Sequence, residues 1–301
     1  MLFENSELEF DVLQSPDFTD QEVTVTIARL DKLHPVVSGN KLFKLHYFLE
    51  ESIKQGNKPV ITFGGAWSNH LVAAAYACGL YGIPCTGIVR GEQPAQLSQT
   101  LIEAEHYGME LHFIPRSTYQ ARDITAMCKL IKKDPANHII IPEGGFHPSG
   151  AAGAALIMNR ISKINATHIC TAVGTATTLA GLLKSRMHNE TIIAVPVLKN
   201  MTDIKDRLVT LGCGEHMNQL DLFDEYHFGG YAKKTEGLIH FMNECFNMHK
   251  VPTDFVYTAK MLYAITDKIK QGYFSPGSTV LCLHTGGLQG NKSLPPETLV
   301  F

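Results

Sequence analysis

The sequence predicts an α/β fold with mainly parallel sheets, and three features support this prediction. Short segments rich in β-branched and aromatic residues alternate with longer segments of helical character along most of the chain. The strand-like segments are almost continuously apolar, which is typical of parallel strands that are covered on both faces. Gly-rich turns follow several of them, at the sheet edge where open α/β sheets bind their ligands.

Eight segments are predicted to be strands, and eight others are predicted to be helices. The strands are Val23–Ile27, Val60–Phe63, Thr86–Val89, Leu111–Ile114, His138–Ile141, His168–Val173, Thr191–Val197 and Thr279–Leu283. The helices are Lys41–Lys54, Asn69–Gly79, Ser98–His106, Tyr119–Lys133, Gly150–Ser162, Thr178–Met187, Lys233–Asn247 and Lys260–Gln271. Residues 45–150 are expected to form a small domain, and residues 1–44 and 151–301 a large one. The cleft between the two is the expected ligand site.

The composition is that of a globular protein and argues against two classes of partner. The 301 residues are 45% hydrophobic and 18% charged, enough for a large core in two domains. A net charge of −3 gives no reason to expect binding to nucleic acid or to an anionic membrane. No segment approaches the roughly 20 apolar residues of a membrane span. The acidic start MLFENSELEF does not resemble a secretion signal, so we expect a cytoplasmic protein.

The cysteines, and the absence of metal-site and serine-hydrolase motifs, argue against three further classes of chemistry. The seven cysteines are odd in number and form no CxxC pair, which fits a reducing compartment. Cys213, Glu215 and His216 are close in sequence, but no second ligand cluster accompanies them, so no metal site is predicted. The GxSxG elbow of serine hydrolases is absent.

The turn Ser38–Lys44 opens a predicted helix and places two lysines on one face. Lys41 and Lys44 are three residues apart and therefore neighbours on a helix. One interpretation is a solvated surface. The other is that one lysine forms an imine while its neighbour neutralises an anion. An imine-forming lysine needs a lowered pKa, which burial and a nearby cation both supply.

Two further turns have the character of anion sites. In Phe63–His70, Ser68 or Asn69 is a candidate helix N-cap, and a helix N-terminus also binds carboxylates. Val173–Thr178 combines backbone N–H groups with three hydroxyls, which suits a phosphate. It lacks the GKS or GKT ending of a P-loop and is a poor GxGxxG, so a plain strand–turn–helix is the alternative. In the turns 142–148 and 283–287, the glycines are also explained by positive φ alone.

Taken together, these motifs resemble the 1-aminocyclopropane-1-carboxylate (ACC) deaminase and D-cysteine desulfhydrase family. SGNKLFKL is similar to its GNKxRKL segment, FGGAWSNH to GGxQSNH, IPEGGFHPSGAAG to IPxGGSxxLGxxG, and GTATTLAGL to the phosphate loop GSGGTxAGL. Three later segments match in order, namely 230–231, 256–260 and 284–287. The resemblance covers about residues 27–289. It implies a two-domain, type II pyridoxal 5′-phosphate (PLP) fold, with twisted, mainly parallel sheets flanked by helices, and a homodimer.

The resemblance also implies roles for individual residues. Lys41 would hold PLP as a Schiff base and move a substrate proton. The other implied catalytic residues are Ser68, Tyr257 and Tyr231. The implied substrate-binding residues are Trp67, Ser68, Asn69 and His70, the last three in a loop for the substrate carboxylate. The implied cofactor-binding residues are Lys41, Lys44, Asn69, Gly174, Thr175, Ala176, Thr177, Thr178, Tyr257 and Thr285. Within this group, Thr285 would lie near the pyridine nitrogen and Asn69 near the 3′-oxygen.

Two positions favour one activity within this family. The ACC deaminase pattern has Glu after the stacking Tyr and Leu before the final Gly pair, where this chain has Thr258 and Thr285. Because a Glu near the pyridine nitrogen strengthens the electron sink, the Thr pair favours β-elimination from a small D-amino acid such as D-cysteine. ACC deamination is the alternative. Two other classes stay open: a PLP- or amino-acid-binding protein without turnover, and a nucleotide-binding Rossmann module.

The chain also departs from the family pattern at several positions. The departures are Phe43, His46, Trp67, Leu71, Val72 and Phe146. We expect them to surround the substrate, so they bear on the substrate more than on the cofactor.

Overall fold

The computed structural model describes residues 7–187 and 190–301, and its strands form two sheets. The strands are β1 (Phe10–Leu13), β2 (Thr24–Ala28), β3 (Val60–Gly64), β4 (Cys85–Arg90), β5 (Met109–Ile114), β6 (Ile139–Ile141), β7 (His168–Val173), β8 (Thr191–Pro196), β9 (Leu220–Leu222) and β10 (Thr279–Leu283). The larger sheet has the order β1-β2-β10-β7-β8-β9 and the smaller one β5-β4-β3-β6. All paired strands are parallel except β1, which runs antiparallel to β2.

The predicted α/β class with mainly parallel sheets is confirmed. All eight predicted strands are present, with ends that differ by at most two residues. The central strand β10 is fixed on both sides, since Cys282 pairs with Ile27 of β2 and Cys170 of β7. Strands β3–β6 form a sheet of their own, while the other sheet draws on both ends of the chain. The domain boundaries at residues 45 and 150 stay a prediction, and residues 1–6 of the large domain lie outside the described part.

Two of the predicted helices are divided in the structure, and two further helices, Pro16–Asp20 and Ile204–Thr210, were not predicted. The helices are α1 (Pro16–Asp20), α2 (Asn40–Lys44), α3 (His46–Lys54), α4 (Asn69–Leu80), α5 (Gln99–His106), α6 (Arg116–Gln120), α7 (Ile124–Leu130), α8 (Pro148–Ile161), α9 (Thr177–Ser185), α10 (Ile204–Thr210), α11 (Glu236–His249) and α12 (Thr258–Lys270). Six short 3-10 helices connect them: η1 (Leu30–Lys32), η2 (Pro135–Asn137), η3 (Glu143–Gly145), η4 (Gly214–Gln219), η5 (Asp224–His227) and η6 (Leu288–Ser293). The helix predicted over 41–54 is divided at Leu45. The one predicted over 119–133 is divided into α6 and α7, because Arg122 has a left-handed φ of 55°.

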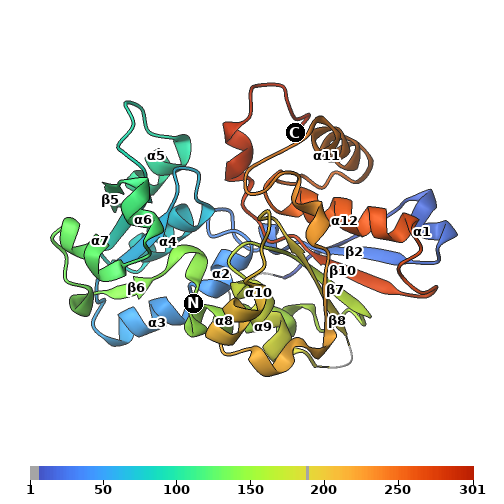
Figure 1. Ribbon diagram of the computed structural model, residues 1–301, viewed down its shortest axis with the longest axis horizontal. Helices are drawn as coiled ribbons and strands as arrows, with labels where there is room; N and C mark the ends of the chain where they lie inside the picture. The colour runs from blue at the N-terminus through green and yellow to red at the C-terminus, as the bar shows by residue number, and fades with distance from the viewer. Residues whose placement is uncertain (1–6, 188–189) are drawn as a thin grey trace.

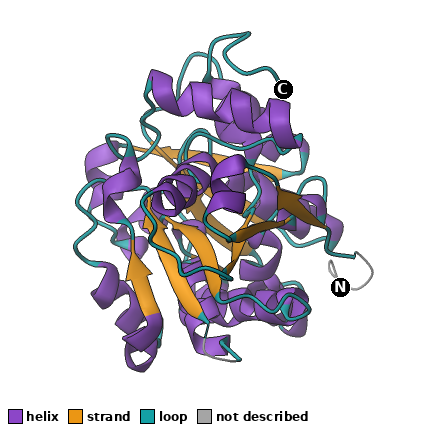
Figure 2. Ribbon diagram, turned by 90° about the vertical axis from the view of Figure 1, so that its right-hand side faces the viewer, coloured by secondary structure: helices purple, strands orange, loops and turns teal. Residues whose placement is uncertain are grey.

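The two sheets lie on opposite sides of a shared helical layer. Figure 1 places the four-stranded sheet with α4–α7 on one side and the six-stranded sheet with α11 and α12 on the other. Helices α2 and α8 pack together between them, and α8 packs against α9. In the turned view, helices flank the strands on both sides (Figure 2). Within the described residues, no helix is long and apolar enough to cross a membrane.

The topology brings the ends of four strands toward one place. In the smaller sheet, the strand order reverses at β3, since β4 and β5 lie on one side and β6 on the other. In the larger sheet it reverses between β7 and β10. Loops after strands at such switch points leave a crevice, which is where open α/β sheets bind ligands. The Gly-rich turns of this chain follow β3, β6, β7 and β10, so the fold gathers them at one site.

Candidate active site

A cavity of about 730 Å³ lies where these four loops meet. This volume is in the usual range for cofactor and substrate pockets. The structure places every side chain predicted for the site in its lining: Lys41, Lys44, Trp67, Ser68, Asn69, His70, Gly174, Thr175, Ala176, Thr177, Thr178, Tyr231, Tyr257 and Thr285. The roles of these residues stay predictions, but their convergence is a property of the fold.

Lys41 reaches the cavity because the start of α2 is fastened to the end of β10. The Asn40 N–H donates to the Thr285 carbonyl at 3.1 Å. Gly39 has a φ of +66°, and a Cβ there would lie only 1.8 Å from the Thr285 oxygen. Only glycine allows this approach of two backbone segments. The contact holds Lys41 next to Thr285, although 244 positions separate them in the sequence.

The environment of Lys41 favours a reactive amine. Its Nζ donates to Asn40 Oδ1 at 2.8 Å, and Asn40 Nδ2 in turn donates to Thr178 Oγ1 at 2.9 Å. The Nζ also lies 5.8 Å from the centre of the Tyr257 ring. Burial lowers the pKa of Lys41 to about 8, against Asp254, which raises it. This is the lowered pKa that the sequence argument required of an imine-forming lysine.

Lys44 lies deeper than Lys41 and is 6% exposed. Burial and then the charge of Lys41 hold its pKa well below the ordinary value. Among the described residues, no carboxylate lies within ion-pair distance of either lysine. Burial without a counter-ion disfavours the charged form of both amines, and an anionic ligand in the cavity would offset that cost. The solvated-surface interpretation of this lysine pair is therefore wrong.

The loop after β7 forms a cradle for an anion. Ala176 caps α9 with a left-handed φ of 66°, and the Thr175 and Thr177 hydroxyls lie 2.9 Å apart. The first N–H groups of α9 have no acceptor within the helix and lie at the cavity wall. Gly174 gives space to Tyr257, since a Cβ there would lie 3.2 Å from the ring. These features suit a phosphate group.

The loop after β3 supplies a second helix N-terminus. Ser68 caps α4 by accepting from the Leu71 N–H at 3.3 Å. Asn69 Nδ2 donates to the Gly287 carbonyl at 2.9 Å, which ties this loop to the one after β10. The Asn69 Oδ1 atom is buried and has no partner among the described residues. A buried polar atom of this kind indicates that a ligand completes the site.

His70 presents a second unpartnered atom. Its Nε2 lies 2.8 Å from Thr62 Oγ1, and that hydroxyl donates to the Ile141 carbonyl at 2.9 Å. Since the hydroxyl proton is used there, Nε2 is the donor and Nδ1 carries a lone pair. Nδ1 is buried without a partner among the described residues. Burial, then Lys41 and Lys44, lower the pKa of His70 to about 3, so it is neutral.

Asp254 anchors the opposite wall, at the start of α12. Its Oδ2 accepts from the N–H groups of Val256 and Tyr257, and its Oδ1 from the N–H and hydroxyl of Thr258, all at 2.8–3.0 Å. All four acceptor positions of the carboxylate are thereby used. This arrangement fixes Tyr257, whose ring meets that of Tyr231 edge-on at 6.1 Å.

Comparison with known proteins identifies the family. The family model described as "pyridoxal-phosphate dependent enzyme" matches residues 8–286. This chain belongs to the pyridoxal-phosphate-dependent enzyme family. The nucleotide-binding Rossmann module is therefore excluded. The observed site fits PLP: two unpaired lysines, a phosphate cradle at α9, and buried atoms of Asn69 and His70 that lack partners.

Individual relatives of this PLP-dependent enzyme carry the names of the two activities that the motifs suggested. A Pyrococcus horikoshii protein, provisionally assigned as an ACC deaminase, is 29% identical over 287 residues, covering 88% of this chain and 85% of that protein. The D-cysteine desulfhydrase of Salmonella typhi is 23% identical over 292 residues, covering 90% and 88%. The crystal structure of an ACC deaminase homologue superposes with a TM-score of 0.79 at 25% identity, covering 97% and 92%. Both activities occur among the relatives, so membership alone does not choose between them.

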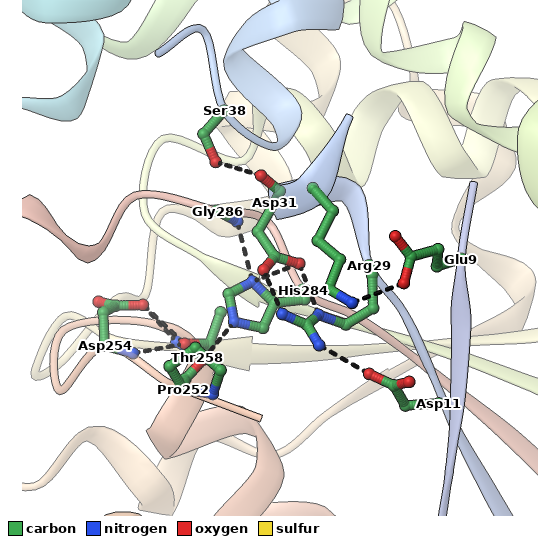
Figure 3. Close-up of polar contacts among 11 residues, drawn as sticks. Glu9, Asp11, Arg29, Asp31, Ser38, Pro252, Asp254, Thr258, His284 and Gly286 are labelled. Atoms are coloured by element: carbon green, nitrogen blue, oxygen red, sulfur yellow. Dashed lines mark hydrogen bonds and ion pairs between the residues drawn. The ribbon is translucent and has the colours of Figure 1, made fainter. Parts of the chain in front are cut away.

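A polar network connects Asp11 to His284, the residue before Thr285, in this PLP-dependent enzyme (Figure 3). His284 Nε2 donates to the Pro252 carbonyl at 2.7 Å, while its Nδ1 is 3.3 Å from both the Gly286 N–H and Asp31 Oδ1. Arg29 connects Asp31 to Asp11, with ion pairs of 2.7 Å to each. The network links β1 and the end of β2 to the residue before Thr285, and so helps to fix the start of that loop.

Two expectations about the site are wrong. Thr258 does not line the cavity, because its hydroxyl donates to Asp254 and accepts the Asp254 N–H. The family departures do not surround the substrate either: of the six, Trp67 alone is in the cavity lining. Phe43, Leu71 and Val72 are at most 2% exposed and belong to packed parts of the fold. Of the six departures, Trp67 is therefore the one expected to affect which substrate binds, and its side chain is 38% exposed.

Several residues that shape the cavity were not predicted from the sequence. Asn40 and Asp254 were not singled out, although each lies within three residues of a predicted site residue. Arg90, Arg116 and Arg122 also line the cavity. The available signal was position, since Arg90 directly follows the predicted strand Thr86–Val89 and Arg116 follows Leu111–Ile114, at the edge where ligands bind.

Lys260 is a further missed residue, and it gives a testable prediction. It is fully buried and donates to the carbonyls of His227 at 2.9 Å and Gly230 at 2.8 Å, which holds the turn before Tyr231. Lys260→Met leaves both carbonyls unpaired. We expect unfolding free energy to fall by about 1–3 kcal/mol and KM to rise more than kcat falls. The control Lys270→Met, on the same helix but exposed, should cost about 0–1 kcal/mol. Equal losses in the two variants would contradict this role.

Proposed function

We propose that this PLP-dependent enzyme catalyses β-elimination from a small D-amino acid such as D-cysteine, giving pyruvate, ammonia and sulfide. The observation that supports this choice is the wall formed by the end of β10 and the start of α12. There, Thr285 offers a hydroxyl, while the Asp254 carboxylate is fully used by its four donors. A hydroxyl near the pyridine nitrogen supports a weaker electron sink than a carboxylate. Loss of an α-proton and a β-thiol needs less charge delocalisation than ring opening of ACC.

The cofactor side of the proposal uses residues that face the cavity. PLP supplies the electron sink that makes the α-proton of an amino acid removable. Lys41 holds the cofactor, and its Nζ takes the α-proton. Lys44 and the loop Gly174–Thr178 hold the phosphate. Asn69 binds at the 3′-oxygen and Thr285 at the pyridine nitrogen.

The substrate side uses the opposite loops. The start of α4, with Ser68, Asn69 and His70, binds the substrate carboxylate, as a helix N-terminus favours an anion. Burial and the adjacent Tyr231 keep the pKa of Tyr257 well above its usual value, so its hydroxyl keeps its proton. That proton is available to the departing sulfur. The Cβ–S electron pair leaves with sulfur, and the resulting 2-aminoacrylate takes up water to give pyruvate and ammonia.

ACC deamination to 2-oxobutanoate and ammonia is the second candidate, because relatives assigned to that activity match most of this chain. A PLP-binding protein without turnover is a third. Homodimer formation remains a prediction of the resemblance, and a cytoplasmic location remains a prediction from the sequence.

The test is 2-oxo acid release by the purified protein with PLP, supplied with D-cysteine, L-cysteine or ACC. We expect pyruvate and sulfide from D-cysteine, with slower or no product from the other two. Product from ACC alone would replace the proposal with deamination. A bound-cofactor absorption band without 2-oxo acid from any amino acid would support the binding protein instead.

A further inference from the structure

One wall of the cavity carries three arginines that the proposed reaction does not use. Arg90 ends β4, Arg116 begins α6, and Arg122 lies between α6 and α7. Among the described residues, none of the three has a carboxylate within ion-pair distance. Arg29 and Arg207, in contrast, both pair with aspartates. We call Arg90, Arg116 and Arg122 the arginine wall.

The fold brings Arg90 next to the backbone that leads into the substrate loop, and Arg116 next to Gly91, the residue after Arg90. β4 and β5 are neighbouring parallel strands in which Arg90 pairs with Ile114, so Arg90 and Arg116 emerge at the same sheet edge. A Cβ on Gly65 would lie 3.4 Å from Arg90 Nη2, which places that group beside the backbone leading to Ser68. A Cβ on Gly91 would lie 3.8 Å from Arg116 Nε.

Two contacts position arginines of this wall, and the wall and the cofactor cradle belong to different sheets. The Tyr119 ring supports Arg90, whose Cζ lies 5.9 Å from the ring centre. Arg122 faces Asp203, since its charge adds to that of Arg207 in lowering the pKa of that carboxylate. The wall belongs to the four-stranded sheet, whereas the phosphate cradle at α9 belongs to the six-stranded one. The cofactor phosphate therefore does not account for Arg90 and Arg116, which the four-stranded sheet positions.

The cavity lining contains more cationic side chains than carboxylates. Its cations are Lys41, Lys44, Arg90, Arg116, Arg122 and Arg207, and its carboxylates are Glu143 and Asp254. The two lysines serve the cofactor in the proposed function, Arg207 pairs with Asp203, and Asp254 is fully hydrogen-bonded. The substrate carboxylate has its place at α4. Within the cavity lining, one carboxylate, that of Glu143, is then left for Arg90 and Arg116, while Arg122 faces Asp203.

We propose that the preferred substrate is a β-substituted alanine whose β-substituent carries a negative charge, bound by Arg90 and Arg116. Guanidinium groups bind phosphate, sulfonate and carboxylate groups through paired, charge-assisted hydrogen bonds. This inference rests on the proposed elimination and extends it. The α-proton goes to Lys41, the Cβ–X electron pair leaves with the anionic group, and water converts the 2-aminoacrylate to pyruvate and ammonia.

The experiment compares O-phosphoserine, as both enantiomers, with the neutral 3-chloroalanine in the holoenzyme and its variants. Arg90→Gln and Arg116→Gln should each lower kcat/KM for O-phosphoserine at least about tenfold more than for 3-chloroalanine, the effect of one charge-assisted hydrogen bond. Arg186→Gln is the control, since Arg186 lies past the far end of α9, outside the cavity lining. This control substitution should leave kcat/KM unchanged for both substrates.

Binding is measured separately by titrating each amino acid against the absorption of the bound cofactor. O-phosphoserine that binds, and binds more weakly in the Arg90 and Arg116 variants, supports the anion site even if no 2-oxo acid forms. In that case only the elimination fails. Equal losses for both substrates, or O-phosphoserine that neither binds nor reacts while 3-chloroalanine does, would overturn the inference and leave the elimination standing.

Discussion

Replacing Lys41 with alanine is expected to lower turnover by at least about 10³-fold, within the range that a positioned acid–base side chain contributes. The absorption band of the bound cofactor should disappear as well. The reason is the pKa of about 8 that burial gives to this amine. At pH 7 about a tenth of such an amine is unprotonated and can react with an aldehyde, far more than for an ordinary lysine.

Lys44→Ala is the matched comparison, because Lys44 lies on the same helix and is also buried. We expect this variant to keep the cofactor band at saturating PLP but to lose it on gel filtration, since a cationic partner of the phosphate is removed. Absorption spectra before and after gel filtration, together with 2-oxo acid release, separate the two roles. Normal turnover by the Lys41 variant would refute the central assignment. Circular dichroism of both variants excludes unfolding as the cause.

The part of the fold that the sequence predicted is the part with a continuous apolar signal. Buried strands such as β7, with five of its six residues buried, could be recognised as apolar segments. β1 and β9 were missed because they are edge strands, short and half-exposed, in which the apolar pattern is interrupted. The division between α6 and α7 was missed because Arg122 adopts a left-handed conformation that its residue type does not announce.

The site was predicted where the chemistry lies in consecutive residues and missed where it depends on contacts across the fold. Glycines and hydroxyls concentrated after β3 and β7 are visible in the sequence. The four hydrogen bonds that Asp254 accepts, and the position of Arg90 beside the loop that leads to Ser68, are not visible there. Thr258 was misplaced for the same reason: the sequence shows that it follows Tyr257, but only the turn at Asp254 decides which way its hydroxyl points.

Asp254→Asn is expected to lower the free energy of unfolding by about 2–4 kcal/mol, because an amide cannot accept from all four donors. Its NH₂ group would face either the N–H groups of Val256 and Tyr257 or the N–H and hydroxyl groups of Thr258. Two buried donors are then left unpaired in either orientation. Urea unfolding of the apo-protein measures the loss.

Asp123→Asn provides the control for this substitution. Asp123 also caps a helix, accepting from the Ala126 N–H at 2.9 Å, but in an exposed position. Asparagine is about as good an N-cap as aspartate there, so the expected change is within about 0.5 kcal/mol. A loss in the Asp254 variant no larger than in this control would mean that the turn does not depend on the carboxylate.

Asp254→Asn should also have an electrostatic effect that loss of structure alone does not produce. The charge of Asp254 raises the pKa of Lys41 against the larger effect of burial. Removing that charge disfavours the protonated amine, so the pKa of Lys41 should fall further below about 8. The reaction of Lys41 with added PLP in the apo-protein would then reach its half-maximal rate at a lower pH. A slower reaction with an unchanged midpoint would mean that Asp254 only supports the turn. A lowered midpoint would mean that the carboxylate that holds Tyr257 also tunes the lysine across the cavity.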